Sequence, residues 1–233
     1  MADPSRRPSE LDMAPERFEH GQPHESLSLL VWRFSEPLSV VSSAPLGGGI
    51  GPRRWVVNAQ VPHAYARLDP EVHLAELASA RGLSGPGVGM LTAVDLRHVR
   101  HEEDGGAHVD VSVGITFPTW AAAPDEHAGH SGASPGIINI GTINIGTINI
   151  VGIVPESLSP AAMVNAVMSV TEAKAQALWE AGVPGTGTAS DAVCIACPDS
   201  GNAHRFGGPR SQWGARLARA VHRAVLTGCR GGA

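Results

Sequence analysis

The sequence predicts a single-domain α+β protein, in which a mixed or antiparallel sheet packs against about three helices. Apolar runs rich in β-formers come in blocks and do not alternate strictly with helical segments, which favours this class over a doubly wound parallel sheet. No internal linker divides the core, so we expect one domain over residues 26–228. A chain of 233 residues is long enough to bury a full hydrophobic core.

The first 25 residues are polar and rich in proline, and they lack the apolar stretch of a signal peptide. We therefore expect a disordered leader over residues 1–25. No apolar run reaches the length of about 18 residues that spans a bilayer. Three cysteines do not suggest a disulfide framework, and a formal charge of -5 argues against a nucleic-acid partner. The sequence thus predicts a cytoplasmic protein without a membrane or nucleic-acid partner.

Short apolar runs predict the strands, and capping signals predict the helices. The predicted strands are Leu27–Phe34, Leu38–Ser43, Trp55–Val61, Thr92–Val99, Val109–Ile115 and Ala192–Ala196. The predicted helices are Asp69–Arg81, Ser159–Ala181 and Gln212–Leu226. The first two helices each begin with a capping residue followed by proline, and each is followed by glycine. The third has an amphipathic pattern.

A five-residue unit is repeated in residues 136–150, GIINI-GTINI-GTINI, after a predicted loop over residues 122–135. Side chains of a strand alternate between its faces, so a shift of five residues reverses every side chain and a shift of ten restores them. We interpret the repeat as a ten-residue duplication that lengthens a strand or a loop.

Eight segments, in order along the chain, resemble the adenosylcobinamide amidohydrolase family. They are SSAPLGGGIG (42–51), RWVVNAQVP (54–62), GPGVGMLTAVDL (85–96), PTWAAAP (118–124), GTINI (146–150), VNAVMSVTEAKAQAL (164–178), GTGTASDAV (185–193) and FGGPRSQWGARLARAV (206–221). The resemblance implies hydrolysis of the amide between aminopropanol and the corrin ring of adenosylcobinamide. The product would be adenosylcobyric acid for cobalamin salvage, and the substrate a corrinoid small molecule.

The repeat departs from the family pattern, which carries one GTINI-like segment where this sequence carries three. Asn139, Asn144 and Asn149 are therefore alternatives for one family position. We favour Asn149, because the apolar continuation VGIV and then Pro155 follow it directly.

Amide hydrolysis needs a nucleophile, a proton donor for the leaving amine and donors for the oxyanion. The segment GTGTASD offers the hydroxyls of Thr186, Thr188 and Ser190 and the carboxylate of Asp191. It lies between the end of a predicted helix and a predicted strand, where loops often carry functional residues. The alternative is that its glycines and threonines only form a tight turn.

Two charged residues lie in the middle of the long predicted helix. Glu172 and Lys174 are two positions apart, so they point in different directions. Their neighbours are mostly apolar, and an unpaired charge on a buried helix is costly. Each is a candidate acid, base or substrate clamp, and the alternative is an ordinary solvated charge. The predicted catalytic residues are therefore Glu172, Lys174, Thr188 and Asp191.

Polar and glycine residues near the predicted strands are candidates for substrate binding. The glycine-rich segment that follows a predicted strand permits close approach of its backbone to a ligand, or it forms a hairpin turn; it lacks the pattern of a P-loop. The predicted substrate-binding residues are Ser42, Ser43, Gly48, Asn58, Asn149 and Thr186. Trp55, Trp120 and Trp213 offer flat apolar surface for a corrin ring, although core packing is the commoner role of tryptophan.

We predict no metal site and no cofactor. Cys194 and Cys197 form a C-x-x-C pair, but residues three apart on a strand face opposite sides, and no second pair exists.

Two further functions stay open at this point. One is a non-catalytic corrinoid-binding protein. The other is a hydrolase that cleaves itself between Gly187 and Thr188 to free a threonine nucleophile. The sequence also leaves a homo-oligomer open.

Overall fold

The computed structural model describes residues 13–21, 26–124 and 146–231. The strands are β1 (Glu16–His20), β2 (Leu27–Ser42), β3 (Gly49–Gln60), β4 (Gly87–Thr92), β5 (Arg100–Asp104), β6 (Ala107–Val113), β7 (Ile148–Ile153) and β8 (Ala192–Cys197). The helices are α1 (Pro70–Ala80), α3 (Pro160–Glu180), α4 (Gln212–Arg230) and the short 3₁₀ helix η1 (Leu96–His98). The predicted α+β class is confirmed, because these helices pack on one mixed sheet.

The described strands form one sheet in the order β4-β3-β2-β8-β7-β6-β5, and β1 pairs with β2 in addition. The β3–β4 and β7–β8 pairs are parallel, and the other pairs are antiparallel. β2 is the shared strand: its first half pairs with β1 and its last residues pair with β8. The register of β2 on β3 shifts between Arg33 and Leu38, around Pro37, which is the kind of irregularity at which strands bend.

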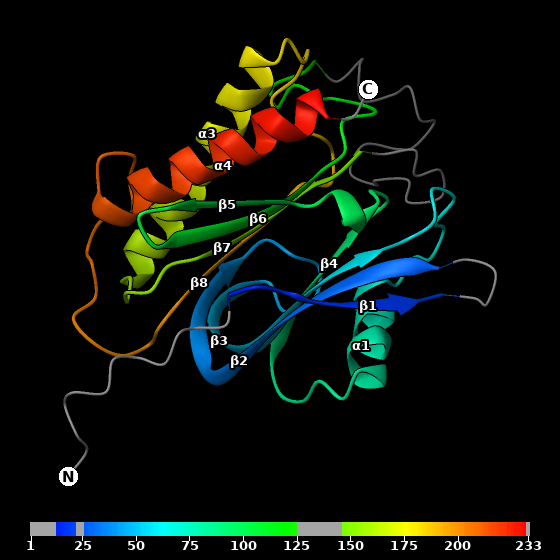
Figure 1. Ribbon diagram of the computed structural model, residues 1–233, viewed down its shortest axis with the longest axis horizontal. Coiled ribbons are helices and arrows are strands. Elements are labelled where there is room, and N and C mark those ends of the chain that lie inside the picture. Colours follow the sequence, from blue (N-terminus) through cyan, green and yellow to red (C-terminus); the bar gives the residue numbers. More distant parts are fainter. Residues whose placement is uncertain (1–12, 22–25, 125–145, 232–233) are drawn as a thin grey trace.

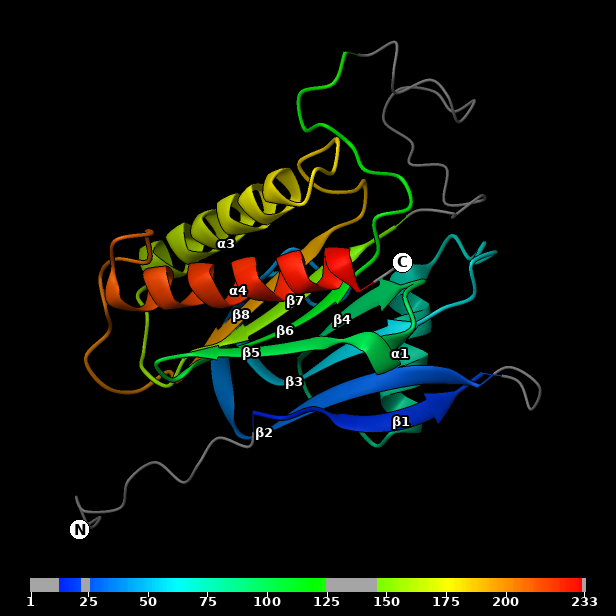
Figure 2. The ribbon, with the colours of Figure 1, turned by 45° about the horizontal axis from the view of Figure 1, so that its top comes forward.

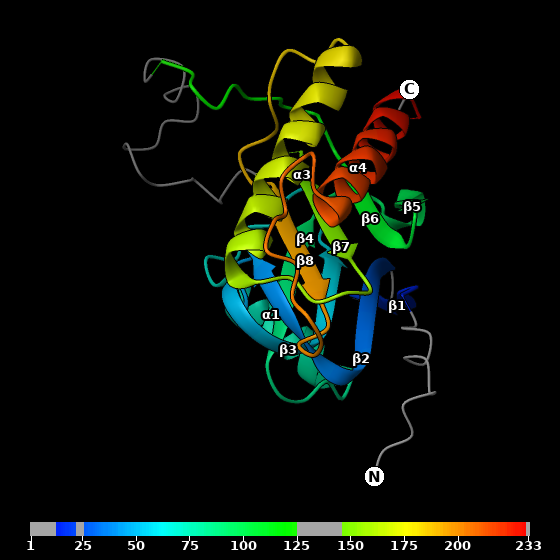
Figure 3. The ribbon, with the colours of Figure 1, turned by 90° about the vertical axis from the view of Figure 1, so that its left-hand side faces the viewer.

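The two halves of this sheet face each other, so the protein has layers of helix, sheet, sheet and helix (Figures 1 and 3). One core cluster lies between α3, α4 and the outer face of β6–β8. A second lies between the two halves of the sheet, where Trp32 and Val56 are buried with Val151 and Cys194. A third lies between α1 and the outer face of β2 and β3. Figure 2 shows α3 and α4 lying across β5–β8, away from α1.

The ends of α3 agree with the signals in its sequence. The Ser159 side chain caps the helix by accepting a hydrogen bond from the amide of Ala162, and Pro160 occupies the first turn. Gly182, with φ of 74°, follows the end of the helix. One face of α3 is buried against the sheet and α4, and this face carries Lys174.

Several predicted boundaries differ from the structure. Glu16–His20 forms β1, although the sequence predicts a disordered leader there. The strand predicted over Thr92–Val99 is wrong: the strand is β4, which ends at Thr92, and η1 follows. The predicted strands Leu27–Phe34 and Leu38–Ser43 are one strand, β2. The polar strand β5 was not predicted, and α4 continues past Leu226 to Arg230.

Some predictions lie outside the described residues. These are the leader over residues 1–12 and 22–25, most of the loop over 122–135, and the first two copies of the repeat with Asn139 and Asn144. The third copy is described, and its last three residues begin β7. None of the helices in the described ranges is both long enough and apolar enough to cross a membrane.

Candidate functional site

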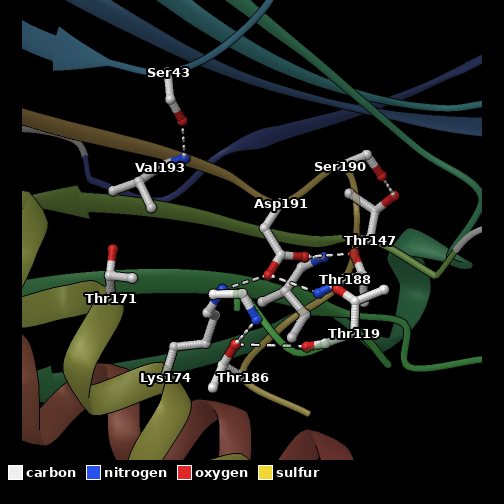
Figure 4. Close-up of polar contacts among 12 residues, drawn as sticks. Ser43, Thr119, Thr147, Thr171, Lys174, Thr186, Thr188, Ser190, Asp191 and Val193 are labelled. Atoms are coloured by element: carbon white, nitrogen blue, oxygen red, sulfur yellow. Dashed lines mark hydrogen bonds and ion pairs between the residues drawn. The ribbon is translucent and has the colours of Figure 1, made fainter. Parts of the chain in front are cut away.

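A buried ion pair joins α3 to the segment that leads into β8. The ammonium of Lys174 donates to the carboxylate of Asp191, which immediately precedes β8 (Figure 4). The two side chains are only 9% and 11% exposed. Removing two charges from water is costly, so such a pair needs close geometry and further hydrogen bonds to persist.

Asp191 has these further hydrogen bonds. The hydroxyl of Thr188 donates to Oδ1 at 2.6 Å, and the amide of Thr188 donates to Oδ2 at 3.1 Å. The amide of Ile148, the first residue of β7, donates to Oδ1 at 2.9 Å. The carboxylate is therefore held from three directions, by α3, by β7 and by the turn before β8, and it has a fixed orientation toward the Thr188 hydroxyl. We call Lys174, Thr188 and Asp191 the polar cluster.

Gly187 permits the close approach of the turn to this ion pair. A Cβ atom at Gly187 would lie 2.3 Å from Oδ2 of Asp191 and 2.5 Å from Nζ of Lys174. Both distances are shorter than any ordinary contact, so a side chain here would displace one member of the pair. Gly187 is thus required because the turn packs closely against the polar cluster.

The turn before β8 is covered by the PTW segment. The amide of Thr119 donates to the carbonyl of Gly187 at 2.8 Å, and the amide of Thr186 donates to the carbonyl of Thr119 at 2.8 Å. The Thr186 hydroxyl accepts from the amide of Ala121 at 3.0 Å. These bonds hold the backbone on both sides of Trp120 against the turn that precedes Thr188, and the Trp120 side chain is about half exposed. Of the three tryptophans proposed for substrate binding, Trp55 and Trp213 are instead buried in the core.

Serine residues connect β2 and β7 to the same end of β8. The hydroxyls of Thr147 and Ser190 are hydrogen-bonded at 2.8 Å (Figure 4). The Ser43 hydroxyl accepts from the amide of Val193 at 3.0 Å, and the Ser42 hydroxyl donates to the Val193 carbonyl at 2.9 Å. Ser42 and Ser43 thus contact Val193, which follows Asp191 by two residues.

Two predicted substrate-binding amides meet between the halves of the sheet. The Asn149 amide donates at 2.9 Å both to Oδ1 of Asn58, on β3, and to the carbonyl of Leu91, on β4. Asn58 donates in turn to the hydroxyl of Ser112, on β6, at 3.2 Å. Both asparagines are buried, and Oδ1 of Asn149 is buried without a hydrogen-bond partner among the described residues. The side-chain amides of Asn58 and Asn149 therefore link the two halves of the sheet. Direct contact of either amide with substrate stays a prediction.

The structure does not bring every predicted residue to the polar cluster. Glu172 is exposed on the outer face of α3, whereas Lys174 is buried, so the two point in different directions, as their spacing predicts. Gly48 lies in the exposed turn between β2 and β3, where a Cβ atom would come within 2.6 Å of the carbonyl oxygen of Ala44. The exposure of Glu172 argues against the catalytic role predicted for it, and the binding role of Gly48 stays a prediction.

The cysteines show no arrangement for chemistry. Cys194 and Cys197 are both buried in β8, and burial raises the pKa of the Cys194 thiol to about 12. A thiol with so high a pKa is a poor nucleophile and a poor metal ligand at neutral pH. Within residues 13–21, 26–124 and 146–231, no group of three or more His, Cys, Asp and Glu side chains is placed to hold a metal ion.

Reasoning from sequence missed Thr119, Thr147 and the backbone amide of Ile148 as partners in the site. The signal was present, because the PTWAAAP and GTINI segments are two of those that carry the family resemblance. Their contacts, however, join residues that are far apart in the chain, and spacing alone does not reveal them.

Comparisons with known proteins agree on one family. The family model described as adenosylcobinamide amidohydrolase matches residues 12–231. The adenosylcobinamide amidohydrolase of Methanosarcina mazei is 28% identical over 195 residues, which cover 80% of this chain and 88% of the relative. The protein of the same name from Halobacterium salinarum is 34% identical over 142 residues, covering 58% of this chain and 55% of the relative.

Solved structures show only a distant likeness. A Burkholderia sp. beta-aminopeptidase aligns with a TM-score of 0.42 and 11% identity, over 92% of this chain and 82% of its own. The PH0078 protein from Pyrococcus horikoshii OT3 aligns with a TM-score of 0.43 and 10% identity, with the same coverage. Neither likeness is close enough to bear on the fold or the activity. The range matched by the family model, in contrast, contains all the described strands and helices and the whole polar cluster. The chain therefore belongs to the adenosylcobinamide amidohydrolase family.

Proposed function

We propose that this protein hydrolyses the amide between aminopropanol and the corrin ring of adenosylcobinamide, and so yields adenosylcobyric acid. The observation that carries the proposal is the family match over residues 12–231. The two relatives that cover more than half of this chain bear the name of this activity. The substrate class is therefore taken from the family, and the roles of individual residues are taken from the geometry of the polar cluster.

Thr188 is the proposed nucleophile. Its hydroxyl already donates to Asp191 at 2.6 Å, so the carboxylate is placed to accept the proton when Oγ1 bonds to the amide carbon. The C–N bond then breaks, and the proton passes from Asp191 to the departing nitrogen. Water next attacks the resulting ester and gives one proton to Asp191. The bond from the acyl carbon to Oγ1 breaks, Asp191 returns this proton to Oγ1 of Thr188, and the carboxylic acid is released. The balance is one amide and one water consumed, and one acid and one amine formed.

Lys174 holds the Asp191 carboxylate in place and contributes positive charge beside it. A fixed cation in a site that excludes water stabilises the negative charge that develops on the carbonyl oxygen. The close approach permitted by Gly187 keeps this charge next to the turn that carries Thr188. Lys174 therefore serves both the orientation of Asp191 and the electrostatics of the reaction.

The half-exposed Trp120 is the proposed contact for the flat macrocycle of the substrate. It lies in the segment that is hydrogen-bonded to Thr186 and Gly187 of the turn. Phe117, three residues earlier, is also exposed. Aromatic faces bury large apolar area at little entropic cost, which suits a planar ring system.

The experiment is to incubate purified protein with adenosylcobinamide, with and without a chelator, and to measure adenosylcobyric acid by mass spectrometry. Product that forms at equal rates in both samples supports the proposed metal-free reaction. Binding in a spectral titration without product would instead support a non-catalytic corrinoid-binding protein. An intact mass of 24.1 kDa in the active preparation would exclude self-cleavage at Gly187–Thr188.

A further inference from the structure

The outer face of α3 carries a line of exposed apolar side chains. Val164 is 47% exposed, Met168 is 54% exposed and Trp179 is 73% exposed. Their spacings of four and eleven residues place them within one narrow stripe of an α-helix, and Ala175 falls in the same stripe. Large apolar side chains that line one exposed stripe are typical of a surface that another molecule covers.

The stripe ends in a shallow cleft at the start of α3. The cleft has a volume of about 460 Å³, and Asn165, Arg205, Phe206 and Arg210 are among its lining residues. Phe206 is 73% exposed. Neither arginine forms an ion pair with another side chain in the described part of the chain. The cleft therefore combines the exposed phenyl ring of Phe206 with the positive charges of Arg205 and Arg210.

The stripe is complementary to itself when it is reversed. A two-fold axis that passes between positions 171 and 172 pairs Val164 with Trp179 and Met168 with Ala175. In such a pairing a large side chain lies opposite a small one at the second position, the arrangement by which ridges of one helix fit the grooves of another. Thr171 then lies opposite Glu172, a hydroxyl beside a carboxylate.

The charges at the two ends of α3 are complementary in the same antiparallel arrangement. Arg205 and Arg210 lie at the beginning of the helix. The exposed Glu172 and Glu180 lie in its second half, where Glu180 also contacts Gln176 and His222. Reversal of a second helix brings the acidic end of one copy over the basic cleft of the other. The same operation directs the exposed Trp179 of each copy toward the cleft beside Phe206 and Arg210 of its partner.

We infer that α3 is the contact of a symmetric dimer, in which the outer faces of two antiparallel α3 helices pack together. The contact is isologous, since each residue pair occurs twice about the axis. The polar cluster is left untouched, because Lys174 lies on the buried face of the same helix. This inference rests on the exposed face of α3 and does not depend on the proposed reaction.

The first test is the mass of the protein in solution, measured by light scattering during gel filtration over a range of concentrations. We expect a dimer of about 48 kDa, twice the chain mass of 24.1 kDa. Met168→Glu places a charge in the middle of the stripe, and we expect it to weaken the dimer by at least about 100-fold. The matched control is Val72→Glu, on α1, which changes a similarly exposed apolar residue on the other side of the molecule and should leave the dimer intact.

The second test uses disulfide formation to determine the direction of the two helices. In a Cys229→Ser background, the double variant Met168→Cys/Ala175→Cys should form a covalent dimer on oxidation, because each new pair lies within disulfide distance. The single variants should remain monomeric on a denaturing gel, since equal positions are separated by about 10 Å along an antiparallel pair. A monomeric wild-type protein, a dimer that survives Met168→Glu, or cross-linking by the single variants would each overturn the proposal.

Discussion

Lys174 and Asp191 form a buried ion pair between the middle of α3 and the residue that precedes β8. Loss of either partner leaves the other charge buried and uncompensated, which costs about 3–5 kcal/mol. We expect Lys174→Met to lower the free energy of unfolding by this amount and to abolish product formation. The double variant Lys174→Met/Asp191→Asn should recover most of the stability, as measured by urea denaturation, but none of the turnover. If the folded double variant still formed product, the pair of Lys174 and Asp191 would have a structural role only.

Thr188 is tested by comparing two replacements. Thr188→Ala removes the hydroxyl that donates to Asp191, and we expect kcat to fall by roughly 10³-fold or more while corrinoid binding is retained. Thr188→Ser keeps the hydroxyl and should keep measurable turnover. Mass spectrometry of quenched reactions should show an added acyl mass on the peptide that contains Thr188. Equal activity of the alanine and serine variants would point to an activated water in place of Thr188.

Glu172 differs from Lys174, two residues later, in being exposed. The sequence places it among the catalytic candidates, but its side chain is exposed on the face of α3 opposite Lys174. We therefore expect Glu172→Ala to keep kcat within about twofold of the wild type, because an exposed charge away from the polar cluster has little effect on the reaction. A loss of turnover comparable to that of Lys174→Met would restore Glu172 to the catalytic set.

Trp120 should affect binding more than chemistry. Trp120→Ala is expected to raise KM by about tenfold, which corresponds to about 1.4 kcal/mol, with kcat little changed. Trp120→Phe keeps an aromatic face and should recover most of the affinity. Steady-state kinetics with adenosylcobinamide measure both effects. An unchanged KM in the alanine variant would remove Trp120 from the substrate contacts.

His101 makes stability depend on pH. Its hydrogen bond to the buried Asp110 raises the pKa of the imidazole above its usual value of 6.5, although partial burial opposes this. A raised pKa in the folded state stabilises the protein fully below the unfolded value, and this stabilisation is lost as pH rises through the folded value. His101→Gln should therefore lower Tm more at about pH 5.5 than at about pH 9. His63→Gln, an exposed control, should show no such difference.

The sequence locates β8 to within one residue, because its side chains are all apolar or small, whereas β3 begins six residues before the predicted strand Trp55–Val61. β4 contains Gly87 and Gly89, a residue type that is depleted in strands, but packing requires them here: a Cβ atom at Gly87 would enter the ring of Trp55, and one at Gly89 would press on Leu74. β5 was missed because RHEED has no apolar residue. It is stabilised from outside, by Arg219 and Arg223 of α4, which bind its acidic side chains.

The candidate site was predictable in its residue types but not in its contacts. Lys174, Thr188 and Asp191 were all singled out by the chemistry that amide hydrolysis needs and by the family resemblance. Their union into one cluster depends on the docking of α3 against the turn before β8, a tertiary contact that spacing along the chain does not encode. The exposure of Glu172 follows from the same docking, since the buried face of α3 could not be assigned from its nearly uniform apolar composition.

The attachment of Asp191 to three separate parts of the fold has a consequence for how the protein matures. Its donors come from residue 148 at the start of β7, residue 174 in α3 and residue 188 in the turn. A chain in which β7 or α3 has not yet docked lacks some of these donors, so the carboxylate is not oriented and the site does not exist. Turnover therefore reports completed tertiary assembly, and a collapsed intermediate with its helices formed should be inert.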